Sequence, residues 1–366
     1  MRIALATDAW TPQTNGVVTT LKATAATLTQ LGHEVRVISP QGLTTIACPS
    51  YPEIRLAFSP GSYVARELKE FSPHAIHIAT EGPLGLAVRR YCRARHVPFT
   101  SSYHTRYPEY LRVRWPIPMA VSYAWLRRFH RAAVRTFVSS ASLETQLAAR
   151  GFRHLHHWRR GVDLRTFHPR PAHPELAPLR RPVMACVGRV AVEKNLDAFL
   201  ALPLPGTKLV IGDGPARAAL ESRYPQVRFA GYRFGSELAA LLSGADVLVF
   251  PSRTDTFGLV MVEALACGVP VAAFPVPGPL DVLEAGVTGV LHEDLARAVA
   301  GALRLERHAC VAAASAFSWQ SATTQFLAGL APIPLPLRAR LAVSRSSAII
   351  ARIAARGQAS GAGDAH

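Results

Sequence analysis

The sequence predicts an α/β protein with two doubly wound domains that face each other across a cleft. Short β-branched runs alternate with helical stretches along the whole chain, which is typical of parallel sheets covered by helices. The alternation stops once, at a proline-rich stretch, and then begins again with the same pattern. At 366 residues and 49% hydrophobic side chains, the chain is long enough to give each domain its own core.

The predicted strands fall into two series. The first series is expected at residues 2–7, 34–39, 75–80, 98–102 and 136–140. The second series is expected at residues 182–188, 208–212, 227–231, 245–251 and 269–274.

A joint between the series is expected at HPRPAHPELAPLRRP (168–182), because five prolines cannot belong to one helix. We therefore predict a first domain over residues 1–168, a linker over 169–182 and a second domain over 183–316. A helix at 317–330 is expected to pack back toward the first domain, followed by a basic tail at 331–366 that adds five arginines and either binds a surface or is disordered.

Three loops lie where doubly wound folds bind ligands, beyond the carboxyl ends of strands and ahead of helices. They are TPQTNGVVTTL (11–21), GRVAVEKN (188–195) and the segment RTDTFGLVMVEALACGVPV (253–271). None of them is a G-x-G-x-x-G or Walker motif. The loops therefore lack the sequence motifs that would indicate a function in hydride transfer or in P-loop phosphoryl transfer.

The third loop places two acids, Asp255 and Glu263, eight positions apart across the predicted start of a helix. If the helix begins near Gly258, its unpaired amides and its dipole favour a bound diphosphate. Helical side chains lean toward the amino terminus, so Glu263 would approach a ribose attached to that phosphate. Asp255, in the loop before the helix, would accept hydrogen bonds from a sugar on the other side. The predicted ligand is a sugar linked by a diphosphate to a nucleoside.

Two cations on the neighbouring loop, Arg189 and Lys194, would offset the repulsion between these acids and phosphate. A plainer interpretation also fits the spacing, in which Asp255 caps the helix and Glu263 pairs with a surface arginine. Spacing alone leaves both interpretations open.

Several motifs together resemble a known family. They are NGVV near the start, YHTRYPEY (103–110), RGVDLRTFHP (160–169), GRVAVEKN, TDTFGLVMVEALACGVPV and FSWQSATTQFL (317–327). In this order they resemble the family-four retaining glycosyltransferases of the GT-B fold, with two Rossmann-like domains. Asp255 replaces the first glutamate of the family's E-x7-E motif. The form SRTDTFG is similar to bacterial diacylglycerol glycosyltransferases and GDP-mannose-dependent alpha-mannosyltransferases.

The resemblance implies roles for individual residues. His104 would lie beside the sugar near the reacting carbon. Considered without the resemblance, His104 is one of 14 histidines and would be interpreted as an ordinary partly buried residue. Arg106 and Glu109 would line the acceptor side. The implied catalytic residues are His104, Asp255, Arg189 and Lys194. The implied donor-binding residues are Gly16, Arg189, Lys194, Asp255, Phe257, Gly258, Leu259 and Glu263.

The expected reaction needs no cofactor other than the nucleotide sugar, which is a co-substrate. Arg189, Lys194 and the helix amides can stabilise the leaving nucleoside diphosphate without a metal, and the chain contains no D-x-D motif. The family retains anomeric configuration, and a front-face reaction suits these residues better than a covalent intermediate. The domains should close to exclude water.

Charge bears on the acceptor. The net charge is +17, and residues 106–170 contain 13 arginines against three acids. Such a surface suits binding to anionic lipid, nucleic acid or phosphorylated small molecules. The excess of arginine can also reflect codon bias, because lysine is scarce in this sequence. Residues 112–135 combine aromatic and arginine side chains, expected on one helix. Such a helix suits a membrane interface, or is an ordinary domain helix with a solvated basic face.

Location is predicted from what the sequence lacks. The five cysteines are odd in number and form no C-x-x-C pair, which indicates a reducing cytosol rather than a disulfide framework or zinc site. We expect neither a signal peptide nor a spanning helix. The predicted location is cytoplasmic, peripheral at the inner face of the cell membrane.

The function favoured from the sequence is transfer of glucose or glucuronic acid from a UDP donor to a lipid such as diacylglycerol. The alternative is a GDP-mannose-dependent mannosyltransferase in glycolipid or polysaccharide synthesis. A nucleotide-sugar epimerase shares the architecture, and a nucleic-acid- or membrane-binding protein without catalysis would explain the charge and leave the acids idle, although no nucleic-acid partner is expected.

Overall fold

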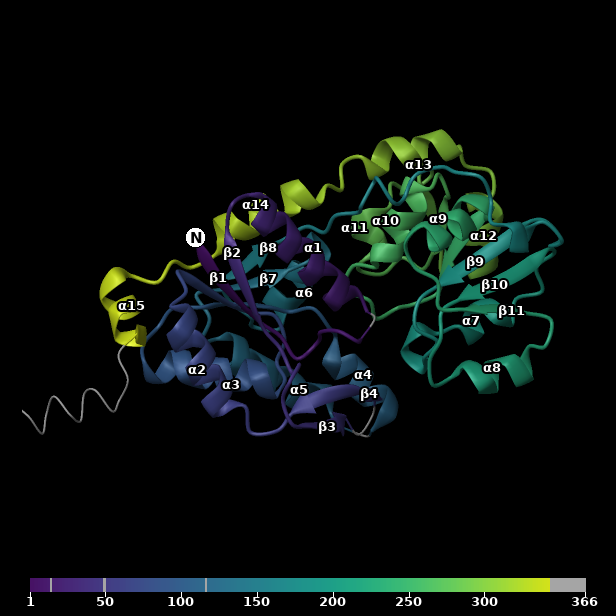
Figure 1. Ribbon diagram of the computed structural model, residues 1–366. Helices are drawn as coiled ribbons and strands as arrows, with labels where there is room; N and C mark the ends of the chain where they lie inside the picture. Colours follow the sequence, from purple (N-terminus) through teal and green to yellow (C-terminus); the bar gives the residue numbers. More distant parts are fainter. Residues whose placement is uncertain (14, 49–50, 116, 343–366) are drawn as a thin grey trace, which may run out of the picture.

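The computed structural model describes residues 1–342 except 14, 49–50 and 116. Figure 1 shows two α/β bodies side by side, each with a twisted parallel sheet between helices. The chain passes once from the first body to the second and then returns along one face to the first.

The first body contains a six-stranded parallel sheet in the order β2-β1-β5-β6-β7-β8. Its strands are β1 (Arg2–Ala6), β2 (Glu34–Ile38), β5 (Ala75–Ile78), β6 (Thr100–Ser102), β7 (Arg135–Val138) and β8 (Leu155–His157). Its helices are α1 (Gly16–Gln30), α2 (Gly61–Phe71), α3 (Pro83–Ala94), α4 (Tyr107–Arg114), α5 (Met119–His130) and α6 (Ala141–Ala149).

The second body repeats the plan, with strands in the order β11-β10-β9-β12-β13-β14. The strands are β9 (Val183–Val187), β10 (Thr207–Ile211), β11 (Arg228–Gly231), β12 (Val247–Phe250), β13 (Val271–Ala273) and β14 (Gly289–Leu291). The helices are α7 (Asp197–Leu200), α8 (Arg217–Arg223), α9 (Gly235–Gly244), α10 (Leu259–Ala266), α11 (Pro279–Val282), α12 (Leu295–Ala302) and α13 (Arg307–Ala314), with the 3-10 turns η1 (Pro174–Leu176) and η2 (Val192–Lys194).

In both sheets the strand order reverses next to the first strand in the sequence, so that later strands are added on either side of it. In the first sheet the reversal lies between β1 and β5, and in the second it lies between β9 and β12. Helices leave such a point on opposite faces of the sheet, so a crevice opens beyond the carboxyl ends of the two strands. The loops after β1, β5, β9 and β12 therefore hold the residues best placed to bind a ligand.

Apolar strands explain why these sheets form. β1, β5 and β12 are buried on both faces, with no exposed residue in their central positions, as expected for a parallel sheet covered by helices. Each sheet packs two clusters of apolar side chains, one against each layer of helices. The strands predicted from the sequence are present, with ends that differ by one or two residues.

Some elements differ from the sequence-based expectation. The antiparallel hairpin β3 (Thr45–Cys48) and β4 (Tyr51–Ala57) was not expected, and neither were the three-residue edge strands β8 and β14. The prediction of one helix in residues 112–135 is wrong. α4 ends at Arg114 and α5 begins after Pro118, which has the extended backbone of a residue that precedes a new helix.

The returning segment joins the first body through α14 (Trp319–Gly329), which packs on α1. Phe326 is fully buried against Phe137 and Trp158, and truncating it to alanine should cost about 3–5 kcal/mol. A side chain at Gly329 would lie 2.4 Å from the Phe137 ring, so only glycine allows this approach.

The chain then forms α15 (Leu335–Ala342), which contacts α2. The predicted basic tail lies outside the described residues from 343 onward. None of the described helices is both long enough and apolar enough to cross a membrane. No disulfide joins the five cysteines, all of which belong to the described part of the chain.

Candidate active site

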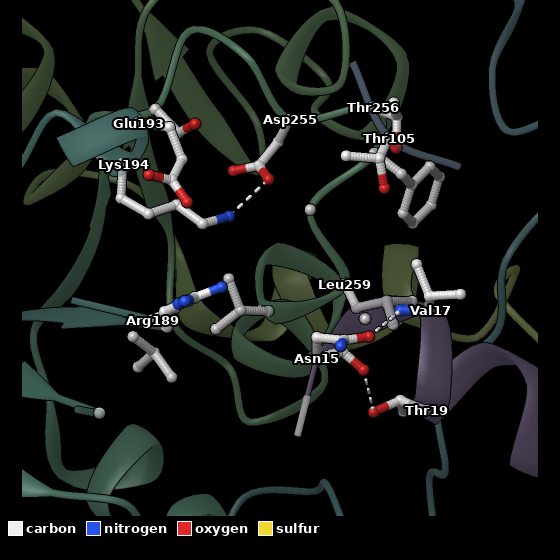
Figure 2. Close-up of a pocket in the computed structure, with 18 of the residues that line it drawn as sticks. Asn15, Val17, Thr19, Thr105, Arg189, Glu193, Lys194, Asp255, Thr256 and Leu259 are labelled. Carbon is white, nitrogen blue, oxygen red and sulfur yellow. Dashed lines mark hydrogen bonds and ion pairs between the residues drawn. The ribbon is translucent and has the colours of Figure 1, made fainter. Parts of the chain in front are cut away.

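A cavity of about 550 Å³ lies between the two domains, at the carboxyl ends of the strands that flank both reversal points. This volume falls in the range of small-molecule sites. Its wall comes from the loops after β1, β5 and β6 on one side and from those after β9, β10 and β12 on the other. Figure 2 shows these loops converging, with Asn15 and Val17 opposite Arg189, Lys194 and Asp255.

The amino terminus of α10 faces the cavity with no side chain capping it. Gly258 precedes the helix with φ 84°, and a side chain there would lie 2.8 Å from Phe250 and Met261. Glycine is therefore required both by the backbone and by the close approach. Phe257, Gly258 and Leu259 all line the cavity. The free backbone N–H groups of this first turn form an anion-binding site that carries no formal charge of its own.

Lys194 and Asp255 form an ion pair at the cavity wall, with 2.5 Å between Nζ and Oδ1 (Figure 2). Burial is the largest influence on the Lys194 ammonium and would lower its pKa, but the Asp255 carboxylate together with Tyr110 and Glu193 outweighs burial and raises the pKa. The second carboxylate oxygen of Asp255, Oδ2, is buried without a hydrogen-bond partner. Asp255 does not cap α10, so the plainer interpretation of its role is wrong.

Glu263 lies one turn inside α10 and lines the cavity. Burial raises the pKa of this group to about 7, although the side chain keeps partial access to the cavity. No cation pairs with Glu263 among the described residues. The interpretation that it pairs with a surface arginine is therefore wrong as well.

Arg189 enters from the loop after β9, immediately after Gly188, and lies on the same side of the cavity as Lys194 (Figure 2). The loop after β10 approaches this loop closely. A side chain at Gly212, where φ is +143°, would lie 1.9 Å from the carbonyl oxygen of Gly188. Glycine at 212 thus lets the two loops share one wall of the cavity.

The first domain contributes the amino terminus of α1. Asn15 caps this helix by accepting hydrogen bonds from Val17 N and Val18 N, both at 3.0 Å. Gly16 is the first residue of the helix, and a methyl group there would lie 3.7 Å from Leu259 Cδ1 of α10. The starts of α1 and α10 therefore meet across the cavity.

His104 lies after β6 and joins the two domains through its backbone, since its carbonyl oxygen accepts a 2.8 Å hydrogen bond from Thr256 Oγ1. Its ring lines the cavity. Nδ1 lies 3.2 Å from Arg160 Nη2, and Nε2 is buried without a partner. Burial and the nearby Arg160 charge lower the pKa of His104 well below its usual value, so the ring is neutral at pH 7.

Arg106 also lines the cavity, and its Nη2 donates a 2.5 Å hydrogen bond to Gln146 Oε1. Glu109 is not part of the cavity wall. Its Oε1 instead accepts a 2.6 Å hydrogen bond from Tyr123 OH within the first domain. The two residues implied for the acceptor side are therefore separated.

Sequence reasoning missed Asp8, which follows β1 and lies in the cavity wall. Its carboxylate accepts hydrogen bonds from Leu84 N and Thr80 Oγ1, both at 2.8 Å, and so caps α3. A side chain at Gly82 would lie 2.5 Å from this carboxylate. An acid directly after a buried first strand was the available signal.

Sequence reasoning also missed Tyr107 and Tyr110 of α4, which line the cavity. α4 contacts η2 of the other domain, and this brings Tyr110 beside Lys194. Burial raises the pKa of Tyr110 to about 12, so its hydroxyl is neutral at pH 7.

Two groups of hydrogen bonds hold the domains together beside the cavity. Ser139 Oγ donates to Thr256 O at 2.9 Å. On the outer side, Asp281 of α11 accepts from Ser142 N at 2.9 Å and from Ser142 Oγ at the start of α6. These contacts hold the two domains together on two sides of the cavity.

Comparisons with known proteins agree with this architecture. A family model described as Glycosyltransferase Family 4 matches residues 14–166, and one described as Glycosyl transferases group 1 matches residues 181–305. A GDP-mannose-dependent alpha-mannosyltransferase of Mycobacterium tuberculosis (strain CDC 1551 / Oshkosh) is 33% identical over 316 residues, covering 80% of this chain and 83% of that protein. Sulfoquinovosyl transferase SQD2 of Arabidopsis thaliana is 33% identical over 270 residues, covering 68% of this chain and 52% of that protein.

Solved structures share the fold. Sucrose-phosphate synthase from Thermosynechococcus elongatus superposes with a TM-score of 0.71 at 21% identity, covering 89% of this chain and 97% of that one. HepE of Anabaena, solved with UDP and glucose, superposes with a TM-score of 0.66 at 18% identity, covering 90% and 98%.

Proposed function

The chain belongs to the glycosyltransferases of family 4 and group 1, with the GT-B fold, and from that premise we propose that it transfers a hexose from a nucleotide sugar to a membrane lipid. The observation that carries the proposal is the cavity between the domains, where a free helix amino terminus lies beside Lys194 and Arg189, with Asp255 and Glu263 on the same side.

GDP-mannose is the donor we now favour. The support is a relative named for GDP-mannose that matches 80% of the chain, which outweighs the sequence-based preference for UDP-glucose or UDP-glucuronic acid. A UDP-linked hexose is the second candidate, supported by the UDP and glucose bound to HepE. In either case the nucleotide sugar is a co-substrate and no other cofactor is proposed.

The donor diphosphate is proposed to lie at the start of α10, where amides and two cations stabilise the charge that grows on it as the sugar leaves. Asp255 Oδ2, which is buried and unpaired, would accept a hydrogen bond from a hydroxyl of the transferred sugar. Glu263 would accept from the ribose hydroxyls. The amino terminus of α10, the Lys194 ammonium and Arg189 would supply this stabilisation, and this supports a proposed reaction that is independent of a metal ion.

The proposed reaction retains anomeric configuration by a front-face path. The bond between the anomeric carbon and the phosphate oxygen breaks, and the acceptor hydroxyl oxygen bonds to the same face of that carbon. The acceptor proton moves to the leaving phosphate oxygen, which takes the bonding electron pair. No protein nucleophile is needed, and the closed domains exclude the water that would otherwise take the sugar.

The proposed lipid side is the outward face of α5 and the segment before it. Trp115, Ile117, Val121 and Trp125 are exposed there, while Tyr123, Leu126 and Phe129 pack in the core. Val121 and Trp125 are one helical turn apart, and Arg128 continues this face. An apolar stripe with arginines suits the boundary of an anionic bilayer, so we place the protein peripherally at the inner face of the cell membrane.

The test is a donor screen on vesicles that contain diacylglycerol, with products identified by mass spectrometry. GDP-mannose, UDP-glucose and UDP-glucuronic acid are supplied separately to the purified protein and to Asp255→Asn. We expect a hexosyl lipid from one donor and at least a hundred-fold slower formation with the variant. Conversion of the donor without acceptor would indicate an epimerase instead. Unchanged activity in the variant, with tight salt-sensitive DNA binding, would indicate a nucleic-acid-binding protein.

A further inference from the structure

Arg160 is a buried cation in the wall of the cavity, at the carboxyl end of β8. Its side chain is 4% exposed and lines the cavity. Nη1 donates to Trp158 O at 2.7 Å, and the guanidinium lies over the Trp158 indole, 4.3 Å from the ring centre. These contacts fix one face and one end of the guanidinium.

No carboxylate neutralises Arg160 among the residues that the structure describes. Burial alone lowers its pKa to about 9, so the group is still charged at pH 7. The two titratable rings on which its charge acts, His77 and His104, both have lowered pKa values and carry no negative charge. A buried charge without a partner is strongly unfavourable, and proteins retain one where a ligand supplies the counter-charge.

The tautomer of His104 adds a second donor beside Arg160. A guanidinium can only donate, so His104 Nδ1 must accept the hydrogen bond from Arg160 Nη2, at 3.2 Å. The ring is neutral, and its hydrogen is therefore on Nε2. That atom is buried, has no partner and belongs to a residue of the cavity wall. Arg160 thus makes His104 a hydrogen-bond donor and not a base.

Arg106 gives the same wall a second buried guanidinium without an acidic partner in the described residues. Its Nη2 is held by Gln146, and its Nε is buried and unpaired. The part of the first-domain wall formed by Arg106, Arg160 and His104 therefore presents cationic groups and N–H donors, while Asp8 of the same wall is held by Thr80 and the start of α3. A group of cations and donors recognises an oxygen anion.

The position of the pair separates it from the diphosphate cradle. Arg160 and His104 belong to the first domain, whereas Lys194, Arg189 and α10 belong to the second. The His104 backbone is bonded to Thr256, the residue after Asp255. The pair therefore lies next to the place where the proposed function puts the transferred sugar.

We propose that Arg160 and His104 form a subsite for an anionic oxygen group of the substrate, a carboxylate, sulfonate or phosphate, carried by the transferred sugar or by the acceptor. The inference rests on the proposed function and narrows its substrate class. If the transferred sugar is mannose, which is uncharged, the anionic group belongs to the acceptor lipid, and diacylglycerol would then be a poor acceptor; if the sugar is a hexuronic acid, the group is the sugar's own carboxylate.

The test measures binding by calorimetry in wild type and Arg160→Gln. The donor arm compares UDP-glucuronic acid with UDP-glucose, and GDP-mannuronic acid with GDP-mannose. The acceptor arm titrates the UDP- or GDP-bound protein with glycerol 3-phosphate and with glycerol. We expect Arg160→Gln to weaken the anionic partner by about ten-fold or more relative to the neutral one in one arm, which identifies the source of the anion.

Arg165→Gln is the matched control, because that arginine is 91% exposed at its side chain and lies in the same loop. Arg160→Lys, which keeps the charge, should preserve most of the preference if Arg160→Gln folds poorly. Equal weakening of charged and neutral ligands, or loss of UDP and GDP binding themselves, would overturn the inference. If wild type binds no nucleotide sugar at all, the proposed function fails first, so the two failures are distinguishable.

Discussion

Lys194 and Asp255 neutralise each other in the cavity before any ligand arrives. The resemblance in sequence assigned Lys194 to the phosphate and Asp255 to the sugar, and it did not predict that the two would pair. The two loops were expected to be neighbours, but spacing along the chain cannot show which side chains of loops 61 residues apart touch, because this depends on the strand order of the sheet and on the path of each loop. Glu263 was easier to place, since one helical turn fixes its distance from the start of α10.

Removing both partners of the pair should cost less than the sum of the two single losses. We expect Lys194→Met and Asp255→Asn each to lower the free energy of unfolding by roughly 2–3 kcal/mol, because each leaves a partly buried charge alone. The double variant should lose about 1–2 kcal/mol less than the sum. Urea unfolding of the four proteins measures the cycle, and strictly additive losses would show that the pair is not coupled.

We expect the ionised Glu263 carboxylate to lower the free energy of unfolding while it contributes to donor binding. Its pKa in the folded protein is raised to about 7 from the ordinary value of 4.5, so the folded state holds a proton that the unfolded state loses between these values. Stability from this group therefore falls as pH rises from 4.5 to 7, by on the order of 3 kcal/mol. Glu263→Gln removes that loss.

Thermal unfolding at pH 5 and pH 8 checks this prediction. Glu263→Gln should melt higher than wild type at pH 8 and nearly level with it at pH 5, while its donor affinity falls. A variant that is less stable at pH 8 would mean that Glu263 has a stabilising partner when charged.

At the scale of elements, most of the fold could be predicted because buried parallel strands are continuous apolar runs. β1, β5 and β12 are of this kind. The hairpin β3–β4 has exposed residues on β3, and β14 has only three residues, so neither gives a strong periodic signal. The stretch 112–135 misled because its arginines and aromatics suggested one surface, whereas Pro118 separates α4 from α5 and half of the aromatics face the core.

The exposed stripe of α5 predicts a membrane variant. Trp125 is 46% exposed and its ring contacts that of Phe129, so Trp125→Ser should lower the free energy of unfolding by only about 1–2 kcal/mol and leave the protein folded. We expect its partition onto anionic phospholipid vesicles to fall roughly ten-fold, because the indole no longer enters the lipid boundary. Vesicle sedimentation measures this. Leu303→Ser, an exposed change on the second domain, is the control, and equal losses for both would argue against α5 as the docking face.

At the scale of the whole molecule, two domains with six-stranded parallel sheets of different strand order line the cavity, and Asp281 of the second domain binds Ser142 of the first. Burial alone would raise the pKa of Asp281, but the hydrogen bonds from Ser142 and Gly278 outweigh it and lower the pKa below the usual 3.8. The stabilisation is therefore present above pH 3.8 and is lost only as pH falls through the lower value. The contact stays closed across the neutral range.

Asp281→Ala should release this contact while every residue of the donor cradle keeps its own side chain. We expect a larger radius of gyration by small-angle X-ray scattering in the absence of ligand, and a KM for donor raised about three- to ten-fold with nucleotide binding retained. Asp294→Ala, which removes a helix cap far from the interface, serves as the control. An unchanged scattering curve would show that other contacts alone hold the domains closed.

The central claim is that the start of α10, with Lys194 and Arg189, binds the paired phosphates of a nucleotide sugar. Calorimetric titration with GDP, UDP and the matching monophosphates tests it most directly, in wild type, Lys194→Met and the exposed control Lys69→Met. We predict that one diphosphate binds at least about ten-fold more tightly than its monophosphate, and that Lys194→Met removes this advantage while Lys69→Met keeps it. No preference for a diphosphate, or a preference that survives Lys194→Met, would contradict the account.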